Sequence, residues 1–173
     1  MKKISLALMI ISALSVSTAH AVVNGGEVHF IGSVSDVTCN INPVVDGVKK
    51  DVIQLGVMGT DGSGSSAVTF SLVPDSAGCL AKTEANVGWQ SSQFSAEGLA
   101  NGSGTATGAF IKLIALNSDN TAISATTQNA TFSGTAGGIK SFDFTAQLQL
   151  IAGTAAATPG SVLASAAYTV AYL

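Results

Sequence analysis

Hydrophobic and polar residues alternate with a period of two along most of the chain after residue 26. Successive side chains of an extended strand point to opposite faces, so this alternation predicts strands that each bury one face. The spacing of three and four residues that indicates amphipathic helices is nearly absent. We predict strands at residues 27–37, 51–57, 67–72, 82–90, 109–117, 130–133, 141–151 and 163–173.

The stretch 141–151 has the cleanest alternation and is predicted to be a central strand, with one face made by Phe142, Phe144, Ala146, Leu148 and Leu150. Stretches rich in Gly, Asn, Asp and Ser separate the strands and favour turns. About eight short strands at this spacing predict an antiparallel β-sandwich. Trp89 and Phe94 are predicted to lie in or near its core; the alternative is an exposed platform for stacking a sugar ring.

Residues 1–21 are typical of a cleaved secretory signal. Lys2 and Lys3 precede an apolar run at 4–16, and small residues lead to a cleavage site at Ala19-His20-Ala21. That run is too short to span the roughly 30 Å of hydrocarbon in a bilayer. Cleavage after residue 21 of 173 leaves residues 22–173, a length that fits one domain with its own core.

Charge excludes two classes of partner. The chain has seven Lys, no Arg and ten acidic residues, and the signal contains two of the Lys, so the mature formal charge is −5. Five scattered Lys provide no basic surface for nucleic acid or anionic lipid. Charged residues are only 10% of the chain. This composition fits either a surface covered by copies of the same protein or a secreted sandwich with a Ser- and Thr-rich surface.

Candidate chemistry is sparse. Cys39 and Cys79 are the only cysteines, and in a secreted protein they are expected to form a structural disulfide, because a redox pair would need Cys-x-x-Cys spacing. His29 is the single mature histidine, and neither a Gly-x-Ser-x-Gly elbow nor a set of zinc ligands accompanies it. We therefore predict no catalytic residue, no metal site and no cofactor. Asn101 and Asn129 begin glycosylation sequons, a short pattern that chance often produces.

The two ends of the mature chain both have strand-like patterns. At the start, one face of an extended segment would carry Val22, Asn24, Gly26, Val28 and Phe30, and the chain ends in the alternating stretch 167–173. A strand at a free terminus can pair with its own domain or with another molecule.

With these residues in order, the chain resembles the major subunits of bacterial chaperone-usher fimbriae of the type 1-like class, in enterobacteria. The resemblance covers the whole mature chain and rests on Asn24-Gly25-Gly26-Glu27-Val28-His29-Phe30-Ile31-Gly32, Val37-Thr38-Cys39, Val52-Ile53-Gln54-Leu55-Gly56, Gly78-Cys79, Gly160 fourteenth from the end and the penultimate Tyr172. The loops 61–66 and 96–107 match no part of the family pattern.

The resemblance implies an all-β, incomplete immunoglobulin-like sandwich that lacks its last strand. Residues 1–21 would be the signal peptide, 22–31 a donor strand that fills the groove of a neighbouring copy, and 32–173 the pilin domain. The disulfide would pin the first two strands. The strand that borders the groove, which a chaperone grips in this family, would carry Gly160, Tyr168, Val170 and Tyr172.

The resemblance also implies a structural, non-enzymatic role. The partners would be other copies in a head-to-tail filament, a periplasmic chaperone and an outer-membrane usher, and the product would be a fimbrium on the cell surface, reached through the periplasm. Some shaft subunits of the family bind host glycans, but this sequence indicates no receptor-binding residue. The alternative function is a secreted, monomeric carbohydrate-binding sandwich that keeps residues 22–31 within its own fold, and an enzyme that uses His29 is a third.

Overall fold

Antiparallel strands make up nearly all the regular structure of the computed structural model, which describes residues 39–119 and 121–173. The predicted signal peptide, the donor segment 22–31 and the predicted strand 27–37 lie outside the described residues. The described residues belong to a unit that spans residues 32–173. Their one helix is the short α1 (Ala77–Leu80), so the all-β prediction is confirmed.

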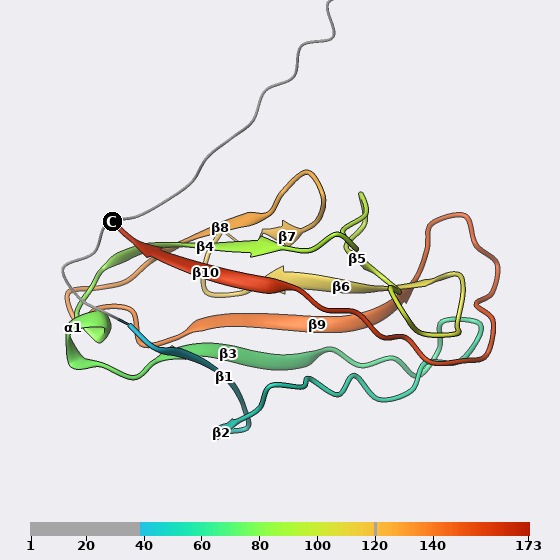
Figure 1. Ribbon diagram of the computed structural model, residues 1–173, viewed down its shortest axis with the longest axis horizontal. Helices are drawn as coiled ribbons and strands as arrows, with labels where there is room; N and C mark the ends of the chain where they lie inside the picture. The colour runs from blue at the N-terminus through green and yellow to red at the C-terminus, as the bar shows by residue number, and fades with distance from the viewer. Residues whose placement is uncertain (1–38, 120) are drawn as a thin grey trace, which may run out of the picture. The chain divides into compact units, whose positions relative to one another are not determined.

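Ten strands occur in the described part of the chain. They are β1 (Ile41–Val45), β2 (Val48–Lys49), β3 (Val68–Pro74), β4 (Glu84–Gln90), β5 (Leu99–Ala100), β6 (Ala109–Ala115), β7 (Ala122–Ile123), β8 (Asn129–Ser133), β9 (Phe142–Leu150) and β10 (Ala167–Tyr172). One sheet follows the order β2-β1-β3-β9-β6-β5, with β7 also paired to β6, and the other is β10-β4-β8 (Figure 1). All their pairings are antiparallel, as predicted.

The strand β9 is central, as its alternation predicts. It lies between β3 and β6, where Phe144 is paired with Phe70 of β3 and with Ala115 of β6. Phe142, Phe144, Ala146 and Leu148 are buried, while the residues between them are only partly buried. Every backbone group of a central strand has a partner on one side or the other, and this explains why the most regular sequence pattern occupies this position.

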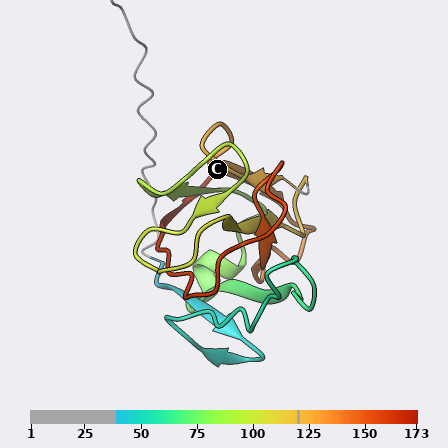
Figure 2. The ribbon, with the colours of Figure 1, turned by 90° about the vertical axis from the view of Figure 1, so that its right-hand side faces the viewer.

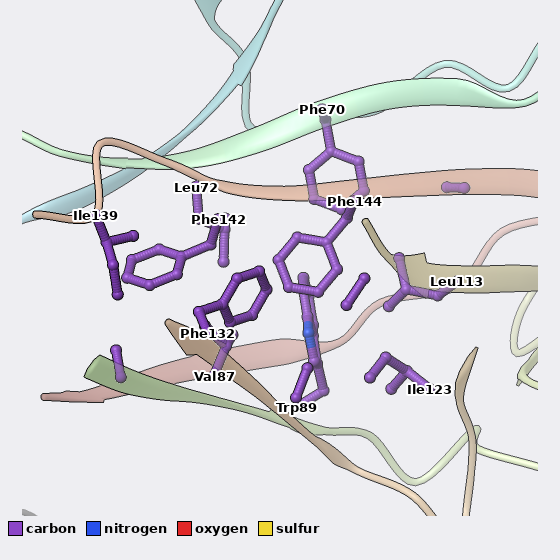
Figure 3. Close-up of a cluster of buried hydrophobic side chains, with 14 residues drawn as sticks. Phe70, Leu72, Val87, Trp89, Leu113, Ile123, Phe132, Ile139, Phe142 and Phe144 are labelled. Carbon is purple, nitrogen blue, oxygen red and sulfur yellow. The ribbon is translucent and has the colours of Figure 1, made fainter. Parts of the chain in front are cut away.

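Aromatic rings from both sheets form the core (Figure 3). Phe70 and Phe144 of the larger sheet stack with ring centroids 5.6 Å apart. Trp89, from β4 of the smaller sheet, forms a T-shaped pair with Phe144 at a centroid distance of 5.2 Å, and Phe132 of β8 forms another with Phe142 at 5.0 Å. Offset and edge-to-face contacts of this kind add to the stabilisation from burial. Trp89 is a core residue rather than an exposed platform, and Phe94 packs against the same core.

The hairpin of β1 and β2 was not among the predicted strands. Its two-residue loop is Asp46-Gly47, with φ angles of 49° and 76°, and the loop is flanked by the paired residues Val45 and Val48. Asp-Gly with positive φ at both positions is the preferred tight turn of a β-hairpin. The apolar residues around Asp46-Gly47 were therefore an available sequence signal.

The predicted strand at residues 51–57 is wrong, since these residues belong to no ladder in the structure. Their side chains still alternate: Ile53 and Leu55 are half-buried against the core, whereas Val52, Gln54 and Gly56 are exposed. The segment thus has the side-chain pattern of a strand but no neighbouring strand among the described residues to supply hydrogen bonds.

Candidate functional site

An apolar groove with a volume of about 910 Å³ opens in the described part of the chain. One wall is the segment 51–60, which follows β2, and the other is the segment 157–168, which leads into β10. In Figure 1 these are the teal and red stretches, and Figure 2 views their looped ends. The groove therefore lies where an edge of each sheet is left open.

Core side chains line the floor of this groove. They come from β3, β4, β6 and β9 and include Phe70, Leu72, Trp89, Leu113 and Leu148. Each of these is at most 8% exposed, so the groove reaches the centre of the sandwich rather than a shallow surface depression. An apolar floor of this depth favours an occupant with apolar side chains.

The C-terminal wall is half of a strand pair. In the register of β10 with β4, Ala167, Thr169 and Ala171 face the β4 backbone, and Leu173 continues the pattern by donating to the carbonyl oxygen of Glu84 at 3.0 Å. The even-numbered residues from 160 to 172 turn their N–H and C=O groups the other way, and these groups have no hydrogen-bond partner among residues 39–119 and 121–173. The wall is therefore a free strand edge able to accept another strand.

Side chains on this wall follow the same alternation. Val162, Ala164, Ala166 and Tyr168 are half-buried and line the groove, whereas the odd-numbered residues between them are exposed. A bound strand would thus meet a backbone edge beside it and small apolar side chains below it.

Hydrogen bonds tie the two halves of the sandwich together at both ends of the groove. At one end the hydroxyl of Tyr168 donates to the carbonyl oxygen of Ile41 in β1, at 2.7 Å. At the other end the N–H of Ala157 donates to the carbonyl oxygen of Thr60, at 2.8 Å. Burial, together with the nearby Asp51 carboxylate, raises the pKa of Tyr168, so its hydroxyl stays protonated and able to donate.

The structure places the predicted C-terminal residues in two groups. Gly160 and Tyr168 line the groove. Val170 and Tyr172 lie further along β10, where the ring of Tyr172 packs on Phe142 with centroids 6.1 Å apart. Burial raises the pKa of Tyr172. The predicted donor residues Val22, Asn24, Gly26, Val28 and Phe30 lie outside the described residues.

Cys39 and Cys79 form a disulfide with their Cα atoms 6.0 Å apart. The bond joins the residues just before β1 to the buried residue at the centre of α1. It therefore fixes the start of the strand that receives the Tyr168 hydrogen bond.

The described residues offer little for other kinds of chemistry. Among them, no group of three or more His, Cys, Asp or Glu side chains is placed to hold a metal ion. Over the same residues, no helix is long and apolar enough to cross a membrane. The side-chain amide of Asn101, one of the two sequon residues, is occupied by hydrogen bonds to the carbonyl oxygens of Ala106 and Ser161.

Comparison with known proteins identifies the family. No protein-family model matches the chain. It is 34% identical over 166 residues to the F107 fimbrial protein of Escherichia coli, covering 92% of this chain and 94% of that protein. The chain belongs to the fimbrial subunits. The K99 fimbrial protein of E. coli is 34% identical over 157 residues, covering 86% of this chain and 85% of that protein. The type-1 fimbrial protein A chain of E. coli K12 is 30% identical over 191 aligned positions, covering 99% of this chain and all of that protein.

A solved structure confirms the fold of this fimbrial subunit. The crystal structure of the P pilus rod subunit PapA is similar with a TM-score of 0.56, over 86% of this chain and all of that chain, at 18% identity. The incomplete immunoglobulin-like sandwich is therefore the fold of the described residues. The family makes this chain a structural, non-enzymatic component of a surface fimbrium, and nothing in the groove or the comparisons favours the carbohydrate-binding alternative.

Proposed function

We propose that this fimbrial subunit polymerises head to tail by donor-strand exchange, in which residues 22–31 of one copy fill the groove of the next. The observation that carries the proposal is the free strand edge of residues 160–172, which lies beside an apolar floor and opposite the unpaired segment 51–57. A strand laid between the two walls would gain ladder hydrogen bonds and bury apolar surface, and this burial stabilises the complex by about 25 cal/mol per Å².

The length and pattern of the donor segment suit this groove. At about 3.3 Å per residue, the nine residues 160–168 extend about 30 Å and the ten residues 22–31 about 33 Å. In an extended segment Val28 and Phe30 share a face and would enter the apolar floor, while Gly26 would let the backbones approach closely. A contact between a terminus and a groove is heterologous and does not close on itself, so its repetition gives a filament.

The proposal includes a periplasmic chaperone and an outer-membrane usher. An apolar groove beside an unpaired strand edge is a site of aggregation in a free subunit, so a partner that covers the edge until assembly is needed. Export through the periplasm agrees with the signal-like pattern of residues 1–21, and the Cys39–Cys79 disulfide requires an oxidising compartment.

Variants of the donor segment test the proposal. We expect Gly26→Leu and Phe30→Asp to block filament growth, because each alters the face that would enter the groove, while circular dichroism of the subunit stays unchanged. His29→Asp is the matched control, since its side chain lies on the opposite face of an extended segment. Electron micrographs that show normal filaments from both Gly26→Leu and Phe30→Asp would refute the donor assignment.

A gel of the native fibres provides a second test. Protein sheared from the cell surface should run as a ladder of oligomers without boiling and collapse to one mature-sized band after boiling, because dissociation requires a β-sheet to be broken. A single monomer band in both lanes would contradict donor-strand polymerisation.

A further inference from the structure

The groove wall at residues 160–166 extends beyond the strand that supports β10. The partner strand β4 ends at Gln90, so its ladder with β10 stops at the pair of Gln90 and Ala167. The loop 91–107, which contains the two-residue strand β5, continues from there and runs alongside residues 161–165. This is the same region whose residues 96–107 have no counterpart in the family pattern.

The loop replaces the missing ladder with bonds to alternate residues of the wall. Leu163 accepts hydrogen bonds at its carbonyl oxygen from the N–H groups of Gly102 at 2.9 Å and Ser103 at 3.2 Å. The N–H of Ser165 donates to Oε1 of Gln93 at 2.9 Å, and its carbonyl oxygen accepts from the Ser91 hydroxyl at 2.6 Å. These bonds satisfy the odd-numbered residues on the side away from the groove.

Ser161 is held in the same way. Its N–H donates to Oγ1 of Thr105 at 3.1 Å, and its carbonyl oxygen accepts from the N–H of Ala106 at 3.0 Å. Residues 161, 163 and 165 thus have both their N–H and C=O groups bonded to the loop. These groups point away from the groove, as do those of the odd-numbered residues of β10 that bond to β4. The residues between them are left in strand geometry, with their backbone groups facing the groove.

Asn101 is the centre of this network. Its Nδ2 donates to the carbonyl oxygens of Ala106 at 2.7 Å and Ser161 at 3.2 Å. Its Oδ1 accepts from the N–H groups of Gly104 at 2.8 Å and Leu163 at 2.9 Å. Two of the four bonds shape the loop and two hold the wall, so a single side chain couples the loop to the groove edge.

We propose that the loop 91–107 is a surrogate strand, in which Asn101 is the positioning residue that keeps the 160–166 edge open and straight for an incoming donor strand. The inference rests on the proposed function and assigns a role to a loop that the family pattern leaves without one. A wall that is already ordered in the folded subunit loses little further conformational entropy when the donor strand binds. The pre-organised wall therefore speeds strand capture and tightens the bound state.

The test uses the mature chain and a fluorescent synthetic peptide of the donor residues 22–31, with capture followed by anisotropy. We expect Asn101→Ala to slow capture about tenfold, the effect of losing the two hydrogen bonds to the wall. Amide exchange at Leu163 should become faster in the same variant before any peptide is added. Asn101→Asp keeps the acceptor for Leu163 but loses the two donated bonds, so its capture rate should be intermediate.

Asn117→Ala is the matched control. Asn117 also bridges two segments, with Nδ2 donating to the carbonyl oxygen of Ser141 at 3.0 Å and Oδ1 accepting from the N–H of Asp143 at 2.8 Å. Unlike the Ser161 and Leu163 that Asn101 holds, neither of these partners lines the groove. Its loss should leave the capture rate unchanged.

The outcomes separate this inference from the proposed function. Equal capture by the wild type and Asn101→Ala would overturn the role of Asn101 and leave donor-strand exchange standing. No capture by the folded wild type would overturn donor-strand exchange and the surrogate strand together. If Asn101→Ala does not fold, Asn101→Asp decides the question, and capture at the wild-type rate by that variant would overturn the inference.

Discussion

Gly160→Ala should destabilise the subunit, because the added methyl group would clash where the groove wall packs closely against the loop 91–107. Gly160 has φ of 156°, and a Cβ atom added there would lie 2.5 Å from Oγ1 of Thr105 and 2.6 Å from the backbone nitrogen of Ala106. Backbone in this region of φ is nearly restricted to glycine and costs about 1–3 kcal/mol for other residues. Displacing Ala106 would also weaken its 3.0 Å hydrogen bond to Ser161, worth about 1 kcal/mol. We expect a loss of about 2–4 kcal/mol in the free energy of unfolding.

Urea unfolding of Gly160→Ala and Gly153→Ala separates backbone strain from the close approach. Gly153 has φ of 79°, and a Cβ atom there would meet nothing within 4 Å, so this control should lose only about 1 kcal/mol. The gain from a less flexible unfolded chain is the same for both substitutions and cancels in the comparison. If both variants lose the same free energy of unfolding, the close packing of Gly160 on the loop is not a constraint and the reasoning is refuted.

Two further changes test the frame of the groove. Replacing Cys39 and Cys79 together by Ala removes a crosslink with a sequence separation of 40 residues. In the chain-entropy model this lowers the free energy of unfolding by about 4 kcal/mol, and a decrease below about 1 kcal/mol in urea unfolding would contradict the model. Tyr168→Phe removes the hydrogen bond to Ile41, so the free energy of unfolding should fall by about 1 kcal/mol near neutral pH. Burial and Asp51 raise the pKa of Tyr168, so above about pH 10 the tyrosine of the unfolded chain ionises before that of the folded chain. The wild type should therefore lose stability as the pH rises through this range, and the loss should be smaller in Tyr168→Phe. Identical pH profiles for the two proteins would count against the raised pKa.

Alternation was enough to predict most of the longer strands, but it missed β1, which pairs with both β2 and β3. The strand β9 follows the predicted 141–151 closely, because a strand with neighbours on both sides and one face in the core has a sequence constrained at every second position. The same reasoning placed β3, β4, β6 and β8 within a few residues of their observed bounds. A strand pattern without a partner misleads this method, as residues 51–57 show: Ile53 and Leu55 alternate correctly, but the neighbouring strand is missing from the described chain.

The groove wall was predictable only in part. Tyr168 and Gly160 were placed near the groove by resemblance to the family, and both line it. Asn101 donates a hydrogen bond to Ser161 and accepts one from Leu163, and both bonds join residues about 60 positions apart. Asn101 lies in a loop with no regular periodicity, so local pattern could not reveal them. The Asn101-Gly102-Ser103 sequence suggested only a turn or a sequon. Its actual role depends on tertiary contacts between two segments that each lack a strand partner on one side.

Trp89 gives this protein a built-in optical signal. It is the single tryptophan of the chain, it lies in the groove floor, and its ring is 5.7 Å from that of Tyr168 on the groove wall. A strand in the groove would bring further apolar side chains against an indole that is 8% exposed in the free subunit, and the emission of an indole depends on the polarity around it. The tryptophan fluorescence of each subunit that receives a donor strand should therefore change in wavelength and intensity, so filament growth can be followed in real time with no label on either partner.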